Sequence, residues 1–237
     1  MNTYLSSDEP PKRVARPIAG RARLRPECAS PQDPVWCELL ESWLHEIHVL
    51  ERSSRSPLVR ARLQDSDRIC TELLQVLRGI EFGEGCASER SLVAVRALGR
   101  TQALSTMFAC PGGTFIELIA TAPWNLLDPP DPRTLRGAGT ALVGHAVSWS
   151  RLRGCLGRVA LQAENPRTFR FYERFGFRRM VPEDAPLELV PMGESGWSLE
   201  VLRVAQGCPG PEEELSPWLV LDPPADAREC WGGPPAA

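Results

Sequence analysis

The sequence predicts an α/β protein in which helices cover both faces of a mixed, mostly antiparallel sheet. Three extended segments in the middle of the chain are separated by the short turn signals "GR" and "PGG", which favours antiparallel neighbours. A strand, a helix and another strand follow in turn, which is typical of a parallel pair. The expected element order is therefore β, α, α, β, β, β, α, β, α, β, β.

The first half of the chain is expected to supply one strand, two helices and three central strands. The segment "RARLRP" at 21–26 is the candidate first strand. In "DPVWCELLESWLHEIHVLE" the apolar residues recur at helical spacing, with Asp33 as N-cap and Pro34 at the first helical position. "SDRICTELLQVLRGI" repeats this pattern, with Ser66 as N-cap. The three extended segments are "SLVAVRALG", "TQALSTMFAC" and "TFIELIATA".

The second half is expected to alternate helices and strands. After the proline-rich segment "PWNLLDPPDPRTL" come a helix in "TALVGHAVSWSRLRG", a strand in "GRVALQAE" and a helix in "PRTFRFYERF". Asn165 and Pro166 start this last helix, and Gly176 is its C′ residue. "FRRMV" and "WSLEVLRV" are expected as two final strands around a loop.

The ends of the chain are expected to be tails around one domain. Residues 1–18 are polar and proline-bearing, and residues 206–237 combine proline, glycine and acidic groups. The apolar stretch "SPWLVL" inside the second tail is a candidate for docking onto the domain. The domain itself is expected over residues 19–205.

The composition excludes several classes of partner. The 237 residues include 43% hydrophobic residues, enough for a core, and the net charge of −3 gives no basic field for a polyphosphate backbone. The eight cysteines form no C-x-x-C pair, which argues for a reducing cytosol and against a zinc site. No apolar run approaches the ~20 residues needed to span a bilayer. We expect a cytoplasmic protein with no metal ion, nucleic-acid partner or membrane partner.

The stretch "LRGAGTALVGHAV" at 135–147 offers main-chain groups to a ligand. Gly137 and Gly139 allow close approach, and the N–H groups at the positive end of the following helix suit a pyrophosphate. A glycine-bearing turn into a core helix is the simpler alternative. The G-K-[ST] of a P-loop is absent, and Leu142 stands where a dinucleotide fingerprint has its third glycine.

A second stretch, "ENPRTFRFYERFGF", places Asn165 and Tyr172 nearly two helical turns apart on one face. Each has a structural alternative, as a helix cap and as a core aromatic. Together, "RGAGTA" with the pattern R/Q-x-x-G-x-G/A and the downstream N-x-x-x-x-x-F-Y-E-R-x-G-F resemble the GNAT superfamily of acyl-CoA-dependent N-acyltransferases. The likeness is strongest over residues 114–180, and the element order extends it to 19–205.

This resemblance implies the GNAT fold, with a splayed parallel strand pair at its centre, and acetyl-CoA as the acyl donor without a metal. It implies that main-chain N–H groups hold the pyrophosphate, that the splayed strand and Asn165 contact the pantetheine arm, and that Tyr172 protonates the departing sulfur. The implied cofactor-binding residues are Leu118, Ile119, Ala120, Thr121, Arg136, Gly137, Ala138, Gly139, Thr140, Ala141, Asn165 and Tyr172.

The implied reaction is direct attack of a primary amine on acetyl-CoA or a similar short acyl-CoA. The protonated amine must first lose a proton, so a base is expected. Glu117 is the first candidate because it interrupts the apolar run "TFIELIATA", although it would also suit an ion pair with an arginine on the solvent side. Glu164 is the second candidate, or a partner for the next helix dipole. The alternative function is a catalytically silent module that binds acyl-CoA.

The segment "PWNLLDPPDPRTL" departs from the short link that is usual in the family. It is expected to be either a lid that carries Trp124, Asn125, Asp128 and Asp131 to the amine or an inert surface loop. None of the three histidines is expected to be catalytic. The amine acceptor and the oligomeric state are left open by the sequence.

Overall fold

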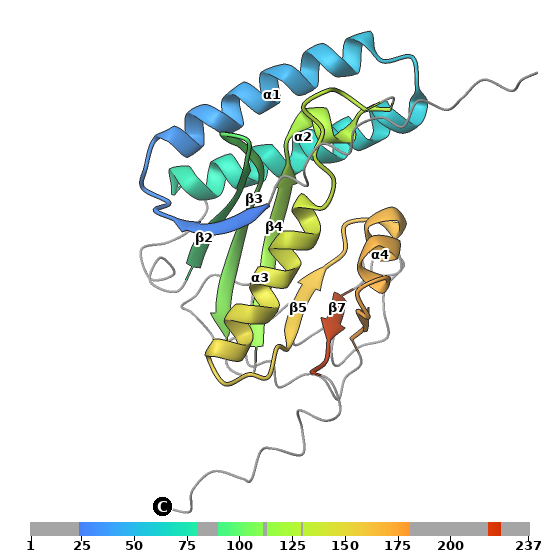
Figure 1. Ribbon diagram of the computed structural model, residues 1–237. Coiled ribbons are helices and arrows are strands. Elements are labelled where there is room, and N and C mark those ends of the chain that lie inside the picture. Colours follow the sequence, from blue (N-terminus) through green and yellow to red (C-terminus); the bar gives the residue numbers. More distant parts are fainter. Residues whose placement is uncertain (1–23, 80–89, 111–112, 129, 181–217, 224–237) are drawn as a thin grey trace, which may run out of the picture.

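The computed structural model (Figure 1) describes these parts of the chain: residues 24–79, 90–110, 113–128, 130–180 and 218–223. Within them a seven-stranded sheet has the order β1-β2-β3-β4-β5-β7-β6. The neighbours β4 (Gly113–Thr121) and β5 (Val159–Gln162) are parallel, and the other neighbouring pairs are antiparallel. The expected mixed, mostly antiparallel sheet is therefore confirmed.

The remaining strands follow the sequence closely except at the two ends of the sheet. They are β1 (Arg25–Ala29), β2 (Arg90–Ala97), β3 (Arg100–Cys110), β6 (Arg178–Arg179) and β7 (Trp218–Leu221). Leu98 and Gly99 both have positive φ between β2 and β3, the geometry of a tight hairpin turn that matches the strand twist. The first strand begins later than the predicted 21–26, of which residues 21–23 lie outside the described residues.

Helices cover both faces of the sheet (Figure 1). The helices α1 (Val35–Ser53) and α2 (Pro57–Arg78) pack on one face, where Leu92 and Ala94 of β2 join their core. The helix α3 (Ala138–Leu152) shares its core with Val93 and Val95 on the opposite face, as does Tyr172 of α4 (Pro166–Glu173). Alternate residues of one strand thus serve the two cores. Among the described helices, none combines the length and the apolar character that crossing a bilayer requires.

Two helix starts differ from their predictions. α2 begins ten residues before its predicted cap, because Ser56 caps it by accepting the N–H of Val59. Ser66 lies inside α2 and is buried against Cys70, so its prediction as an N-cap was wrong. α1 begins with Pro34 at the cap position, one residue later than predicted, although the Asp33 carboxylate still accepts the Val35 N–H at 3.0 Å.

Strand β7 comes from the segment that the sequence assigns to the C-terminal tail. It pairs with both β5 and β6, and Trp218, Leu219 and Val220 are buried. The stretch "SPWLVL" therefore enters the sheet itself, so residues 218–221 are not part of a tail. The predicted strand "WSLEVLRV" lies outside the described residues, and the other domain boundaries stay predictions.

The proline-rich segment after β4 is packed onto the core. It opens with the 3-10 helix η1 (Pro123–Leu126), in which Trp124 is only 7% exposed and meets Trp43 edge-on at 6.3 Å. The Trp124 Nε1 and the Asn125 Nδ2 both donate to the Oε1 of buried Gln102, each at 3.2 Å. Both predicted roles, a lid over the substrate and an inert surface loop, are therefore wrong for Trp124 and Asn125.

The second half of this segment is held by charge. Arg133 stacks 4.6 Å above the Trp124 ring and bonds both Asp131 at 2.9 Å and Glu46 at 2.7 Å. The hydrogen bonds from Arg133 hold the pKa of Asp131 below its usual range. Asp131 thus anchors the segment to α1, and Asp128 is exposed.

Candidate active site

A cavity of about 720 Å³ opens where β4 and β5 part. The last paired residues of the two strands are Ile116 and Leu161, after which β4 runs on to Thr121 while β5 ends at Gln162. The cavity walls come from α2, β4, the ends of β5 and η1, the start of α3, and α4. Its volume is in the range of small-molecule sites.

The predicted site residues divide into those that line this cavity and those that do not. Glu117, Leu118, Ile119, Thr121, Gly139 and Tyr172 line it. Ala120 is instead buried in the core beneath α1 and α2, because its side chain points to that face of β4. The following residues are also absent from the lining: Arg136, Gly137, Ala138, Thr140, Ala141 and Asn165.

The start of α3 presents main-chain N–H groups beside the cavity. Gly137 occupies the N-cap position with φ of 99°, in the left-handed region that favours glycine, and no side chain caps this end. The Ala141 N–H donates to the Gly137 carbonyl at 2.9 Å, so that amide is engaged within the helix. The N–H groups before it belong to the first turn, which has no intrahelical partners and lies at the positive end of the helix dipole.

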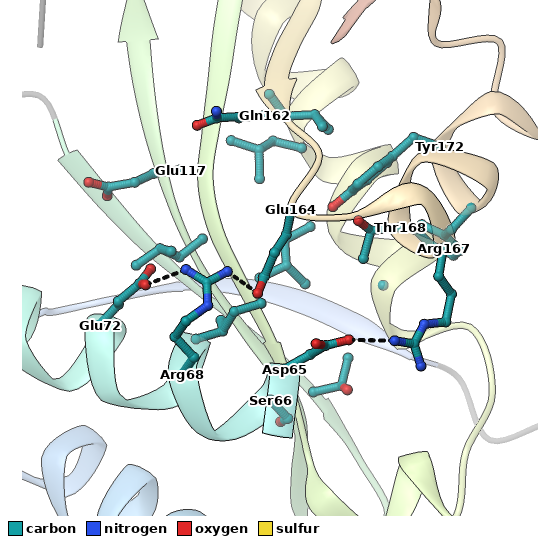
Figure 2. Close-up of a pocket in the computed structure, with 18 of the residues that line it drawn as sticks. Asp65, Ser66, Arg68, Glu72, Glu117, Gln162, Glu164, Arg167, Thr168 and Tyr172 are labelled. Carbon is teal, nitrogen blue, oxygen red and sulfur yellow. Dashed lines mark hydrogen bonds and ion pairs between the residues drawn. The ribbon is translucent and has the colours of Figure 1, made fainter. Parts of the chain in front are cut away.

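Tyr172 projects from α4 into the cavity (Figure 2). Its side chain packs against the rings of Phe171 and Phe177, with centroid distances of 5.1 Å and 5.5 Å. The residue is 9% exposed, and this burial raises the pKa of Tyr172 above its ordinary value. The phenol therefore stays protonated at neutral pH and is able to donate its proton.

Glu117 forms a buried ion pair on the cavity wall. Its Oε1 accepts from Arg90 at 2.9 Å, and the two side chains are 7% and 9% exposed. The Arg90 guanidinium also lies 4.5 Å from the Phe108 ring centroid. The alternative of an arginine pair is thus confirmed, but the pair is buried rather than on the solvent side, and Glu117 still lines the cavity.

Glu164 reaches the cavity from the end of β5. Arg68 of α2 pairs with both Glu164 and Glu72, and Figure 2 shows the guanidinium between the two carboxylates. The Glu164 side chain is 18% exposed. Its charge is therefore balanced by an arginine from α2 rather than by the dipole of α4 alone.

Asn165 is engaged in structure. Its Oδ1 accepts the N–H groups of Arg167 at 3.0 Å and Thr168 at 3.1 Å, which with the Thr168 hydroxyl completes a capping box. Its Nδ2 donates to Asp65 of α2 at 3.2 Å. The prediction that Asn165 caps α4 is confirmed, and both ends of its amide have partners in this structure.

Comparison with known families bears on the segment that forms these two helix starts. The profile of the family described as "Acetyltransferase (GNAT) family" matches residues 134–177. Residues 134–177 are a GNAT acetyltransferase segment. The GNAT segment holds the start of α3, strand β5 and α4 with Tyr172. A search of curated proteins finds no match.

Solved structures with a similar arrangement include three acetyltransferases. One is aminoglycoside 6'-acetyltransferase type Ii, with 13% identity and a TM-score of 0.46 over 84% of this chain and 96% of that chain. An acetyltransferase from Thermus thermophilus has 12% identity and a TM-score of 0.44 over 85% and 97%. PaiA N-acetyltransferase from Thermoplasma acidophilum, described in complex with coenzyme A, has 14% identity and a TM-score of 0.42 over 67% and 91%.

The sequence predictions missed the wall that α2 builds opposite the GNAT segment. Arg62, Asp65, Arg68 and Glu72 line the cavity from this helix. The spacing of Asp65, Arg68 and Glu72 puts them on one face of a helix, and the Arg68–Glu72 pair is an i,i+4 pair visible in the sequence. That spacing predicts a charged face, but it does not say what the face meets.

Gly139 of the GNAT segment offers a test of the contact between α3 and α4. A Cβ at Gly139 would lie 3.3 Å from the Phe171 Cζ, whereas a Cβ at Gly144 in the same helix would have nothing within 4 Å. We expect Gly144→Ala to stabilise the protein by up to about 1 kcal/mol through helix propensity. Gly139→Ala should lack that gain because Phe171 must move. Urea unfolding measures both variants, and equal gains would contradict a tight α3–α4 contact.

Proposed function

We propose that this chain is an acyltransferase that moves an acetyl or similarly short acyl group from acyl-CoA to a primary amine. The observation that carries the proposal is that the first turn of α3, at Gly139, and Tyr172 open onto one cavity between parting parallel strands, inside a GNAT segment. The acceptor is an amine whose identity the proposal leaves open.

The donor-binding groups fit a ligand with a diphosphate and an extended arm. The first-turn N–H groups of α3 and the Arg136 guanidinium suit the diphosphate, since helix N-termini bind anions. Within the described strands, the main chain of β4 from Leu118 to Thr121 lies beyond its pairing with β5 and suits the arm. Acetyl-CoA would supply the acyl thioester here. A contact with Asn165 requires its Nδ2 to exchange Asp65 for the ligand.

Two side chains then handle protons. The Tyr172 hydroxyl donates its proton to the departing sulfur, a task for which a phenol kept neutral by burial is suited. Glu117, on the cavity wall, takes the proton of the amine directly or through water, and Glu164 is the second candidate. The fold needs no covalent attachment of the acyl group to the protein for this transfer.

Thiol release tests the proposal. The full chain is mixed with acetyl-CoA and pooled primary amines, and free thiol is followed with and without the amines. We expect release that depends on an amine. A chain that binds CoA by calorimetry yet releases no thiol across the panel would instead be a silent acyl-CoA-binding module. We also place the protein in the cytoplasm, because its described cysteines are free thiols.

The pH profile separates the acid from the base. Burial raises the pKa of Tyr172 above its ordinary value of 10.0, because desolvation disfavours the phenolate. The protonated acid therefore persists from neutral pH to about pH 10. We expect kcat to rise with pH as the amine and base deprotonate, with no alkaline fall before that point. An alkaline limb near pH 8 that is absent from Tyr172→Phe would contradict the assigned proton donor.

A further inference from the structure

Helix α4 is tied to α2 across the cavity by two polar contacts. Asp65 Oδ2 accepts from Asn165 Nδ2 at 3.2 Å and from Arg167 Nη2 at 2.9 Å. One turn further along α2, Arg68 pairs with Glu164. Figure 2 shows both ties reaching from α2 to the connection between β5 and α4. Three of the four residues 164–167 are thus held by one face of α2.

These ties act on a helix that is too short to hold its own place. α4 has eight residues, and isolated helices of that length are unstable in water. Its position depends on the capping box at Asn165, the aromatic packing of Phe171 and the contacts to α2. Asp65 contacts the cap residue itself and its neighbour Arg167, so it fixes the direction in which α4 leaves β5.

We infer that Asp65 is a positioning residue that sets the place of the Tyr172 hydroxyl in the cavity by holding the first turn of α4. The inference rests on the proposed function only for its effect on rate. Tyr172 lies two helical turns after Asn165, so a change of direction at the cap displaces the hydroxyl. A misplacement of about 1 Å at a reacting group is able to lower a rate about a hundredfold.

A double-mutant cycle tests the inference through catalysis. We expect Asp65→Ala to lower kcat about tenfold in the wild-type background and less than about twofold in the Tyr172→Phe background. The reason is that a displaced hydroxyl matters only while the hydroxyl is present. Equal losses in both backgrounds would overturn the inference. Asp65→Asn keeps an acceptor for Asn165, so it should recover most of the rate and provides a second variant if Asp65→Ala folds poorly.

Asp67→Ala is the matched control. Asp67 lies on the same helix and pairs with His48 of α1 at 2.8 Å, but it does not line the cavity. Its loss removes an ion pair of α2 without touching α4. A fall in kcat as large as that of Asp65→Ala would show a general effect of weakening α2 and would overturn the inference.

Fluorine NMR tests the placement without any activity. The chain has two tyrosines, Tyr4 and Tyr172, so 3-fluorotyrosine labelling gives two resonances that Tyr172→Phe assigns. We expect the Tyr172 resonance to shift or broaden in Asp65→Ala and to keep its position in Asp67→Ala. An unchanged resonance in Asp65→Ala overturns the inference even if no acyl transfer is found. A shifted resonance with no thiol release would refute the proposed function and leave the positioning role standing.

Discussion

Replacing Tyr172 with Phe is expected to lower kcat by about a hundredfold or more while leaving CoA affinity within about twofold. The variant removes one oxygen from a side chain that is already packed against two rings, so the helix and the cavity wall keep their shape. What is lost is the proton donor that burial keeps neutral. Steady-state kinetics with saturating acetyl-CoA measure kcat, and calorimetry measures the Kd of CoA.

The matched control is Tyr4→Phe, the same chemical change at the other tyrosine of the chain. It should leave both constants unchanged, because residues 1–18 are predicted to be a tail. If Tyr172→Phe turns over as fast as the wild type, Tyr172 is not the acid and its hydroxyl is a feature of the core alone. A rise in the Kd of CoA with unchanged kcat would assign Tyr172 to donor binding instead.

Truncating Trp124 is expected to destabilise the fold by about 3–5 kcal/mol. The indole is buried in the core of α1 and α2, meets Trp43 edge-on, and carries Arg133 on its face. Trp124→Ala removes these contacts and one donor to the buried Gln102. Urea unfolding measures the loss, and the slope of the transition shows whether the native state stays compact.

Two further variants calibrate that loss. Trp124→Phe keeps a ring but removes the N–H, so it should cost about 1–2 kcal/mol. Leu152→Ala changes a side chain that is 87% exposed and should stay within about 0.5 kcal/mol of the wild type. If Trp124→Ala were nearly neutral for stability but raised KM, the segment after β4 would be a lid after all.

The same segment connects stability to the ligand site. Thr134 Oγ1 donates to the Trp124 carbonyl at 2.7 Å, and the Leu135 N–H donates to Asn125 Oδ1 at 3.0 Å. These bonds fix the chain immediately before Arg136 and Gly137, where α3 begins. The core therefore holds the end of the cavity at which we propose that the diphosphate binds.

Local patterns in the sequence were enough to predict most elements and part of the site. The spacing of apolar residues predicted four helices, and the glycine and asparagine signals predicted the starts of α3 and α4 within two residues. Both stretches that resemble the GNAT superfamily lie in the segment that matches that family. Prediction failed at Ser66, where a suitable cap residue lies within a longer apolar repeat, so burial decided its place.

By itself, then, the sequence determined where helices and strands form and that Gly139 and Tyr172 belong to one motif pair, because propensity, capping and periodicity act over a few residues. Only the tertiary structure decided the partners of the charged groups. Asp65 meets Asn165 a hundred residues away, and Arg90 rather than a surface arginine neutralises Glu117. These contacts depend on the order of strands in the sheet and on which helix face is buried. That order also places β7, a short apolar stretch in a polar context, beside β5, the strand that parts from β4 at the proposed site.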